Sequence, residues 1–201
     1  MIELLAITDD ATPPEPPLVA VRSGGLSALC APAEDAAVTA DTLWRREAVL
    51  EALMEDRDLL PVRFGTRVAD EAAAARAVAE RRTELEAGLE RVRGAVELSL
   101  RVHAPEPADA PPPEASSGNA YMRAKATRTQ AAARLHEPLA TLARASVVRP
   151  APELLRAAYL VEREAVEPFV ARVRELQREH PALSLLCTGP WPPYSFSEDP
   201  S

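Results

Sequence analysis

The sequence predicts an α+β protein with two domains, residues 1–92 and residues 93–201. Its 201 residues suffice for one large domain or two small ones. Segments in which apolar residues alternate, as in strands, are interspersed with segments in which they recur every three or four residues, as in helices. Because both halves contain strands and helices, we favour two domains.

The first half begins with three predicted strands. Ile2–Ile7 is a short apolar run that precedes a proline-rich loop. Leu18–Val21 and Leu26–Cys30 flank the pair Gly24-Gly25, and glycine supplies the positive φ that a tight hairpin turn requires. This pattern predicts a β-hairpin.

A helix, a strand and a longer helix complete the predicted N-terminal domain. Asp41 or Thr42 can cap the first helix, whose apolar residues lie near helical spacing. Leu59–Phe64 is predicted to return as a strand. Asp70 then caps one long helix that ends before Gly94.

The second half has a clearer periodicity. Apolar residues alternate with polar ones over Ala95–Val102, which is typical of a half-buried strand. A helix is predicted at 121–142, with a kink at Pro138, and a second helix at 166–180. Short strands are predicted at 146–149 and 154–161, and a last strand at 183–187. The order β-α-β-β-α-β is that of a ferredoxin-like fold.

Two segments are rich in proline. The stretch Ala104–Ser117 contains too little apolar surface to offset its ordering entropy, so we expect a mobile loop. In the tail, residues 189–201, three prolines surround Trp191 within four positions, which excludes a helix or a central strand. Such a stiff, extended segment suits either a staple across its own domain or a grip on a partner.

Composition excludes several classes of function. The hydrophobic and charged fractions, 47% and 27%, are typical of soluble globular proteins, and no apolar run approaches the ~18 residues of a membrane span. The formal charge of -8 leaves no positive field for nucleic acid or an anionic membrane. The first apolar run has no basic start, as a signal peptide would. We therefore expect a cytoplasmic protein without nucleic-acid or membrane partners.

The residues with catalytic or ligating potential do not form recognised motifs. The three histidines stand alone, and the two cysteines, Cys30 and Cys187, lie far apart within apolar runs typical of buried thiols. Glu86 and Glu90 share a helix face, but exposed acids beside arginines are the ordinary outcome. No glycine-rich phosphate loop is present. We expect no catalytic residue, no metal and no cofactor.

Two segments far apart in the chain form a specific pair, LPVRFGT at Leu60–Thr66 and GPWPPYSF at Gly189–Phe196. With Gly118–Tyr121 and Ala157–Glu164 between them, the chain resembles the gas vesicle GvpL/GvpF family from about Leu4 to Phe196. Members of this family often carry a histidine in the helix before LPVRFGT. Here Arg45 and Arg46 stand near that position, so no role of that histidine is carried over.

The resemblance implies a non-enzymatic, cytoplasmic accessory protein that binds the small hydrophobic shell protein of gas vesicles and assists vesicle formation. It also implies contacts with other accessory proteins, a place on the vesicle, and an N-terminal α+β domain joined to a ferredoxin-like one. The candidate partner-binding residues are Arg63, Phe64, Gly65, Trp191, Pro192, Pro193, Tyr194 and Phe196. The alternatives are a small-molecule-binding or enzymatic α+β protein and a purely structural vesicle component.

Overall fold

The chain folds into two compact α+β units. The computed structural model describes residues 1–10, 12, 14–33, 39–104 and 118–197. Unit 1 comprises Met1–Val96 together with the chain from Trp191 onward, and unit 2 comprises Glu97–Pro190. Each unit has its own sheet.

Unit 1 is built on a sheet in the order β2-β3-β1-β4, with β5 also pairing with β1. Its strands are β1 (Ile2–Thr8), β2 (Val19–Ser23), β3 (Leu26–Pro32), β4 (Leu60–Pro61) and β5 (Arg67–Val68). The pairs of β1 with β3, β4 and β5, and of β2 with β3, are antiparallel. The predicted hairpin is confirmed, and Gly24 and Gly25 adopt φ values of 59° and 92° in its turn.

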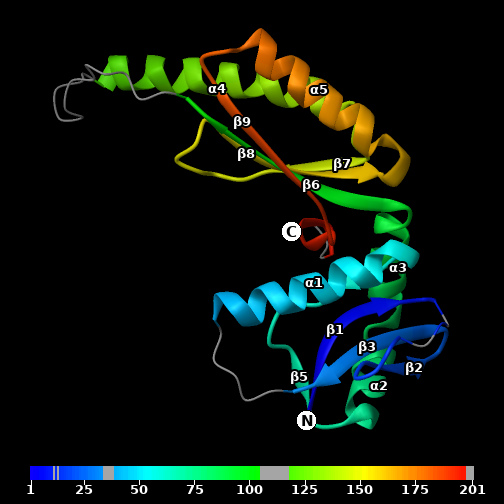
Figure 1. Ribbon diagram of the computed structural model, residues 1–201. Coiled ribbons are helices and arrows are strands. Elements are labelled where there is room, and N and C mark those ends of the chain that lie inside the picture. The colour runs from blue at the N-terminus through cyan, green and yellow to red at the C-terminus, as the bar shows by residue number, and fades with distance from the viewer. Residues whose placement is uncertain (11, 13, 34–38, 105–117, 198–201) are drawn as a thin grey trace. The chain divides into compact units, whose positions relative to one another are not determined.

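Three helices cover this sheet. They are α1 (Ala40–Asp56), α2 (Glu71–Glu80) and α3 (Arg82–Val92). Figure 1 shows α1 over one face of the sheet and α2 beneath the other. Because helices lie on both faces, four consecutive residues of β1, from Leu4 to Ile7, are buried.

The first helix begins earlier than predicted. Its N-cap is Thr39, whose Oγ1 accepts a hydrogen bond of 3.2 Å from the backbone N–H of Thr42. In return, the Thr42 hydroxyl oxygen accepts one of 3.0 Å from the backbone N–H of Thr39. Thr42 is therefore the third residue of a capping box and not the cap itself.

The predicted long helix after Asp70 is two helices. Asp70 caps α2 as expected, with its Oδ1 accepting from the N–H of Ala73 at 2.8 Å. At Arg81 the backbone leaves helical geometry, with φ −107° and ψ 16°. The break lets α2 pack against β2 and β3 while α3 packs against β4 and β1.

The predicted strand Leu59–Phe64 is a strand at only two residues and leads into a turn. Only Leu60–Pro61 pair with β1, and the backbone then turns through Gly65 at φ 78° before β5. The carbonyl of Arg63 accepts from both the N–H and the hydroxyl of Thr66, at 3.2 and 2.8 Å. The N–H of Val62 still donates to the carbonyl of Leu5 on β1, at 2.9 Å, and beyond Val62 these local hydrogen bonds replace the ladder of a continuing strand.

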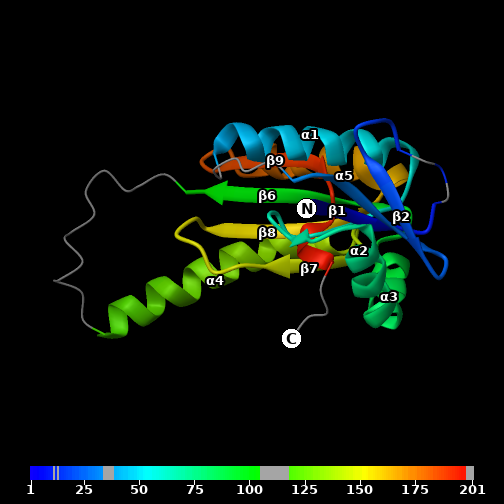
Figure 2. The same cartoon turned by 90° about the horizontal axis from the view of Figure 1, so that it is seen from below.

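Unit 2 has the element order β-α-β-β-α-β. Its main elements are β6 (Ala95–His103), which begins at the end of unit 1, α4 (Gly118–Ala140), β7 (Ala145–Val148), β8 (Leu155–Glu162), α5 (Val166–Glu179) and β9 (Ser184–Trp191), which ends at the return to unit 1. The strand order is β7-β8-β6-β9 (Figure 2). Both helices lie on one face of the sheet (Figure 1).

The core of unit 2 is a cluster of buried apolar side chains. Leu100, Leu139, Val161 and Phe169 are fully buried in one cluster between the sheet and the two helices. The ring of Phe169 lies 5.0 Å from that of Tyr159, centre to centre. Pro138 lies inside α4, in its last turn.

The tail returns to unit 1. We predicted that residues 189–201 belong with the C-terminal domain, and that a strand ends at Cys187. Instead, β9 extends to Trp191 as an edge strand, where a proline is tolerated because no further strand needs its N–H. Residues 191–197 then belong to unit 1. The predicted mobile loop lies almost wholly outside the described residues.

Candidate functional site

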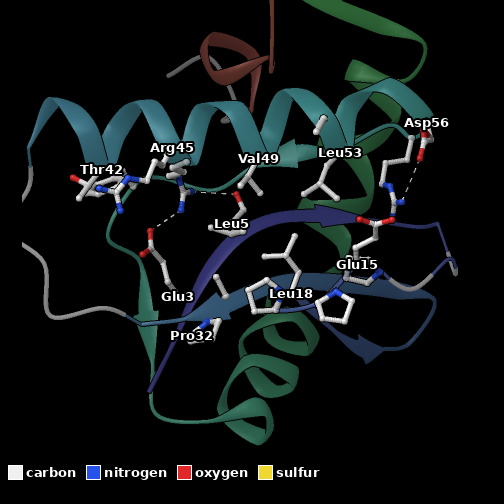
Figure 3. Close-up of a pocket in the computed structure, with 18 of the residues that line it drawn as sticks. Glu3, Leu5, Glu15, Leu18, Pro32, Thr42, Arg45, Val49, Leu53 and Asp56 are labelled. Carbon is white, nitrogen blue, oxygen red and sulfur yellow. Dashed lines mark hydrogen bonds and ion pairs between the residues drawn. The ribbon is translucent and has the colours of Figure 1, made fainter.

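A cavity of about 720 Å³ opens in unit 1 between α1, the sheet and the loop before β2. Figure 3 shows α1 as its roof, with Val49 and Leu53 pointing down toward Leu5, Leu18 and Pro32. Its volume lies within the ~300–1,000 Å³ that ligand pockets occupy.

Arg46 holds α1 above the sheet. Its side chain is 6% exposed, and Nη1 lies 2.6 Å from Oε1 of Glu3 on β1. Nη2 donates to the carbonyls of Leu5 and Val62 at 3.2 and 2.5 Å. A buried charge requires such partners, so this network fixes the distance between α1 and the sheet.

An irregularity in β1 supplies one of the carbonyl acceptors of this network. The pairing of β1 with β3 shifts between Leu4 and Ala6, so Leu5 has no direct partner on β3. The Leu5 carbonyl accepts instead from the N–H of Val62 at 2.9 Å and from Arg46. Such bulges redirect backbone groups, and here the group meets the buried guanidinium.

The turn Arg63-Phe64-Gly65 borders the cavity. The Arg46 guanidinium carbon lies 5.5 Å from the centre of the Phe64 ring, a cation–π distance. The N–H of Gly65 donates to Oε1 of Glu3 at 3.2 Å, the same oxygen that binds Arg46. Phe64 is one of the lining residues, so the structure brings the first predicted segment to the cavity.

The two ends of the cavity differ in charge. At the end near Thr42, three arginines, Arg45, Arg46 and Arg67, meet one carboxylate, Glu3. At the other end two carboxylates, Glu15 and Asp56, meet one arginine, Arg57. Figure 3 shows Arg45 and Glu3 at one end and Glu15 and Asp56 at the other.

The predicted tail residues lie elsewhere in unit 1. Pro192, Pro193 and Phe196 are buried, and the Phe196 carbonyl accepts from Nη1 of Arg91 on α3 at 3.2 Å. Tyr194, 36% exposed, donates to Oε2 of Glu47 on α1 at 3.5 Å. Burial, and then the Glu47 charge, raise the pKa of Tyr194. None of these residues is among the described residues that line the cavity.

The thiol of Cys30 is buried, that of Cys187 is half-buried, and both are protonated at neutral pH. Burial raises the pKa of Cys30 to about 11, with a smaller contribution from the charge of Glu71, and burial also raises the pKa of Cys187. A protonated thiol is a poor nucleophile. Within the described ranges, no three histidine, cysteine or acidic residues converge as metal ligands.

Sequence reasoning missed the cavity and the role of Arg46. A signal was present, because Arg46 and Arg57 continue the buried stripe of Leu50 and Leu53 at helical spacing. An arginine on such a stripe indicates a buried partner, but which strand supplies it is not readable from the local sequence.

Fold and site together define an α+β protein of two units, with a charged-ended apolar cavity in the first. The family model "Gas vesicle synthesis protein GvpL/GvpF" matches residues 7–198. The chain therefore belongs to the GvpL/GvpF family of gas vesicle synthesis proteins.

Relatives and solved structures agree with this membership. The chain is 31% identical to gas vesicle protein L of Streptomyces sp. (strain CB03234), over 82% of this chain and 71% of that protein. It is 30% identical to gas vesicle protein F of the same strain, over 92% and 90%. Crystal structures of GvpF from Anabaena sp. PCC7120 and from Microcystis aeruginosa share the fold. The Anabaena structure has a TM-score of 0.84 and 18% identity, and the match covers 100% of this chain and 97% of that one. The Microcystis structure has a TM-score of 0.79 and 19% identity, and the match covers 98% of each chain.

Proposed function

We propose that this protein is an accessory factor of gas vesicle formation that binds the small hydrophobic shell protein without catalysis and assists its assembly. The observation that carries the proposal is the family match over residues 7–198, nearly the whole chain. We place its action in the cytoplasm and at the growing vesicle, with other accessory proteins as further partners.

The physical requirements of such a task support the proposal. A shell subunit must keep its apolar surface from water before assembly, so its carrier needs an apolar recess on a charged body. Unit 1 offers a recess lined by Leu5, Leu18, Val49 and Leu53. The net charge of -8 favours solubility of the complex. Among the described helices, none is long and apolar enough to cross a membrane.

We propose the turn Arg63-Phe64-Gly65 as part of the binding surface. Arg63 and Gly65 are exposed, and Phe64 lines the cavity. For the predicted tail residues, burial of Pro192, Pro193 and Phe196 in unit 1 supports a packing role. We propose Tyr194, which is exposed, and the half-buried Trp191 as the tail residues that contact a partner.

We further infer that the two units act as domains and that unit 2 is ferredoxin-like. Its element order β-α-β-β-α-β and its strand order β7-β8-β6-β9 support this assignment. The boundary would lie near residue 96, with the tail contributed back to the first domain.

A second candidate is a small-molecule-binding protein, because the cavity has the size of a ligand pocket. A metabolite that fits it would raise the melting temperature of the purified protein. At 100 times its Kd, a ligand of the native state adds about 2.7 kcal/mol of stability.

Co-expression with the shell protein tests the proposed function. We expect the two proteins to co-purify, and to stay together at about 1 M salt, where screening reaches ~3 Å and surface ion pairs fade. A deletion strain should lose or deform its vesicles. The matched control is the shell protein expressed with an unrelated acidic carrier. Absence of co-purification at low and at high salt, with normal vesicles in the deletion strain, would contradict the proposal.

A further inference from the structure

We propose that the cavity under α1 binds one extended, apolar segment of the shell protein that carries an acidic residue at one end and a basic residue at the other. This inference rests on the function proposed above. It adds the site, the conformation of the bound segment and the charge order that the site selects.

The charged ends of the cavity specify the charges of the segment. Arg45 is exposed at the mouth, and among the described residues its side chain has no ion-pair partner. Arg46, in contrast, is already neutralised by Glu3 at 2.6 Å. An acidic residue of the partner would therefore pair with Arg45.

The opposite end favours a basic residue. Asp56 is 71% exposed at its side chain and lies 3.8 Å from Arg57, a loose contact. Glu15 is also exposed and lines the same end. Two carboxylates against one arginine leave a net negative end, which complements a lysine or arginine of the partner.

The dimensions of the cavity favour an extended segment. Arg45 and Asp56 are eleven residues apart on α1, about 16 Å along the helix axis at ~1.5 Å per residue. A strand of about five residues spans that length at ~3.3 Å each. An α-helix of that length would need about eleven residues. An extended segment therefore joins the two charged ends with less chain to order on binding.

The apolar wall between the charged ends supplies the driving force. Val49 and Leu53 face Leu18 across the cavity (Figure 3). Because Arg46 fixes the distance between α1 and β1 through several hydrogen bonds, the recess is open before a partner arrives. A pre-formed site avoids the ordering cost of creating one on binding.

The test uses the full chain co-expressed with its cognate shell protein. Arg45→Glu places an acid opposite the proposed acid, and Ala52→Trp fills the mouth from an exposed lining position. Each should lower the ratio of shell protein to this protein in the purified complex about tenfold, as expected for repulsion or obstruction within an interface.

Two controls carry the same substitutions elsewhere in unit 1. Arg76→Glu changes an exposed arginine on α2, and Ala48→Trp changes an exposed alanine on α1 outside the described lining residues. Both should keep the wild-type ratio. The melting temperatures of all four variants show whether a loss of binding comes from unfolding. Arg45→Glu changes a surface residue, so it still tests the site if Ala52→Trp proves unstable.

A photo-crosslinking amino acid at position 52 then identifies the bound segment. We expect a crosslink to an apolar shell segment flanked by an acid and a base, and none from position 48. Changing that acid to lysine should restore binding of Arg45→Glu. If wild type captures no shell protein, the proposed function and this site both fail. If wild type, Arg45→Glu and Ala52→Trp capture it equally, only the site is wrong.

Discussion

Unit 2 closes its core with apolar side chains, whereas unit 1 holds a helix on its sheet through buried arginines and leaves a cavity. In unit 2, Leu139, Val161 and Phe169 are all 0% exposed. In unit 1, Arg46 and Arg57 are 7% and 9% exposed, and about 720 Å³ remains open. The difference teaches that the two units hold their helices in different ways, through apolar contacts in the unit 2 cluster and through buried arginines with carboxylate and carbonyl acceptors in unit 1.

A matched pair of leucine substitutions gives the largest expected effect and tests this difference directly. Leu176→Ala in the core of unit 2 should cost about 4 kcal/mol, because the packed neighbours cannot fill the gap. Leu53→Ala beside the existing cavity should cost only about 2 kcal/mol, since fewer contacts are lost.

Chemical denaturation can follow the two units separately. Trp44 belongs to unit 1, whereas Trp191 ends β9 where the chain returns to unit 1, so Trp191→Phe in every variant leaves Trp44 as the fluorescence reporter of unit 1. Far-ultraviolet circular dichroism reports both units. Equal losses for the two leucine variants would contradict the comparison, and Arg174→Ala at an exposed position of α5 serves as the control.

The second prediction concerns the arginine that supports α1. Arg46→Met should destabilise unit 1 by about 3 kcal/mol, because Glu3 and the carbonyls of Leu5 and Val62 lose their donor while remaining partly buried. Fluorescence-detected denaturation measures the loss. Arg45→Met, on the exposed side, should change stability by less than about 0.5 kcal/mol. A gain in stability from Arg46→Met would show that unit 1 also prefers apolar packing.

The third prediction tests whether the tail belongs to unit 1. Phe196→Ala should lower the stability of unit 1 by about 2 kcal/mol, less than for a central phenylalanine because residues near a chain end relax more easily. The transition seen by fluorescence should shift. Tyr194→Phe, which removes a long hydrogen bond to Glu47 and keeps the ring, should have little effect. A loss confined to unit 2 would contradict the assignment.

The smallest expected effect concerns a hydrogen bond of Tyr159 in the core of unit 2. Tyr159 is fully buried, and its hydroxyl shares a hydrogen bond of 2.9 Å with Nδ1 of His136. Tyr159→Phe should cost about 1 kcal/mol at neutral pH. Leu160→Met, a volume-conserving change at another buried position of β8, indicates how much of that cost is general repacking.

The same tyrosine predicts a decline in stability at alkaline pH. Burial raises the pKa of Tyr159 above its ordinary value of 10.0, with a smaller contribution from Cys187. The folded state therefore favours the protonated phenol, and its contribution is complete below pH 10 and is lost as pH rises toward the folded pKa. The unfolding free energy of unit 2 should fall above about pH 10 in wild type and less in Tyr159→Phe. Identical curves would contradict this.

Local patterns were enough to predict most elements. The alternation over Ala95–Val102 became β6, the glycine pair became the hairpin turn, and Asp70 capped α2. These features depend on residues within one turn or one strand of each other. The break at Arg81 and the turn at 63–65 were missed, because they depend on which strands the flanking residues pack against.

The candidate site was predicted only in part. Arg63, Phe64 and Gly65 lie beside the cavity, but the tail residues lie against α1 and α3 instead. The cavity itself joins residues from β1, the loop before β2, α1 and the turn after β4. No sequence window contains that set.

The sequence by itself determined the α+β class and nearly all of the helices and strands, since these follow from side-chain periodicity and local caps. The resemblance to the family came from the paired segments at Leu60–Thr66 and Gly189–Phe196. Only the tertiary structure decided that Arg46 is buried rather than solvated, that the tail belongs to unit 1, and that a cavity lies under α1. The physical reason is that burial and ion pairing depend on contacts between residues up to 147 positions apart, as for Tyr194 and Glu47. Periodicity can place an arginine on a buried helix face, as for Arg46, but it does not say which distant residue is its partner.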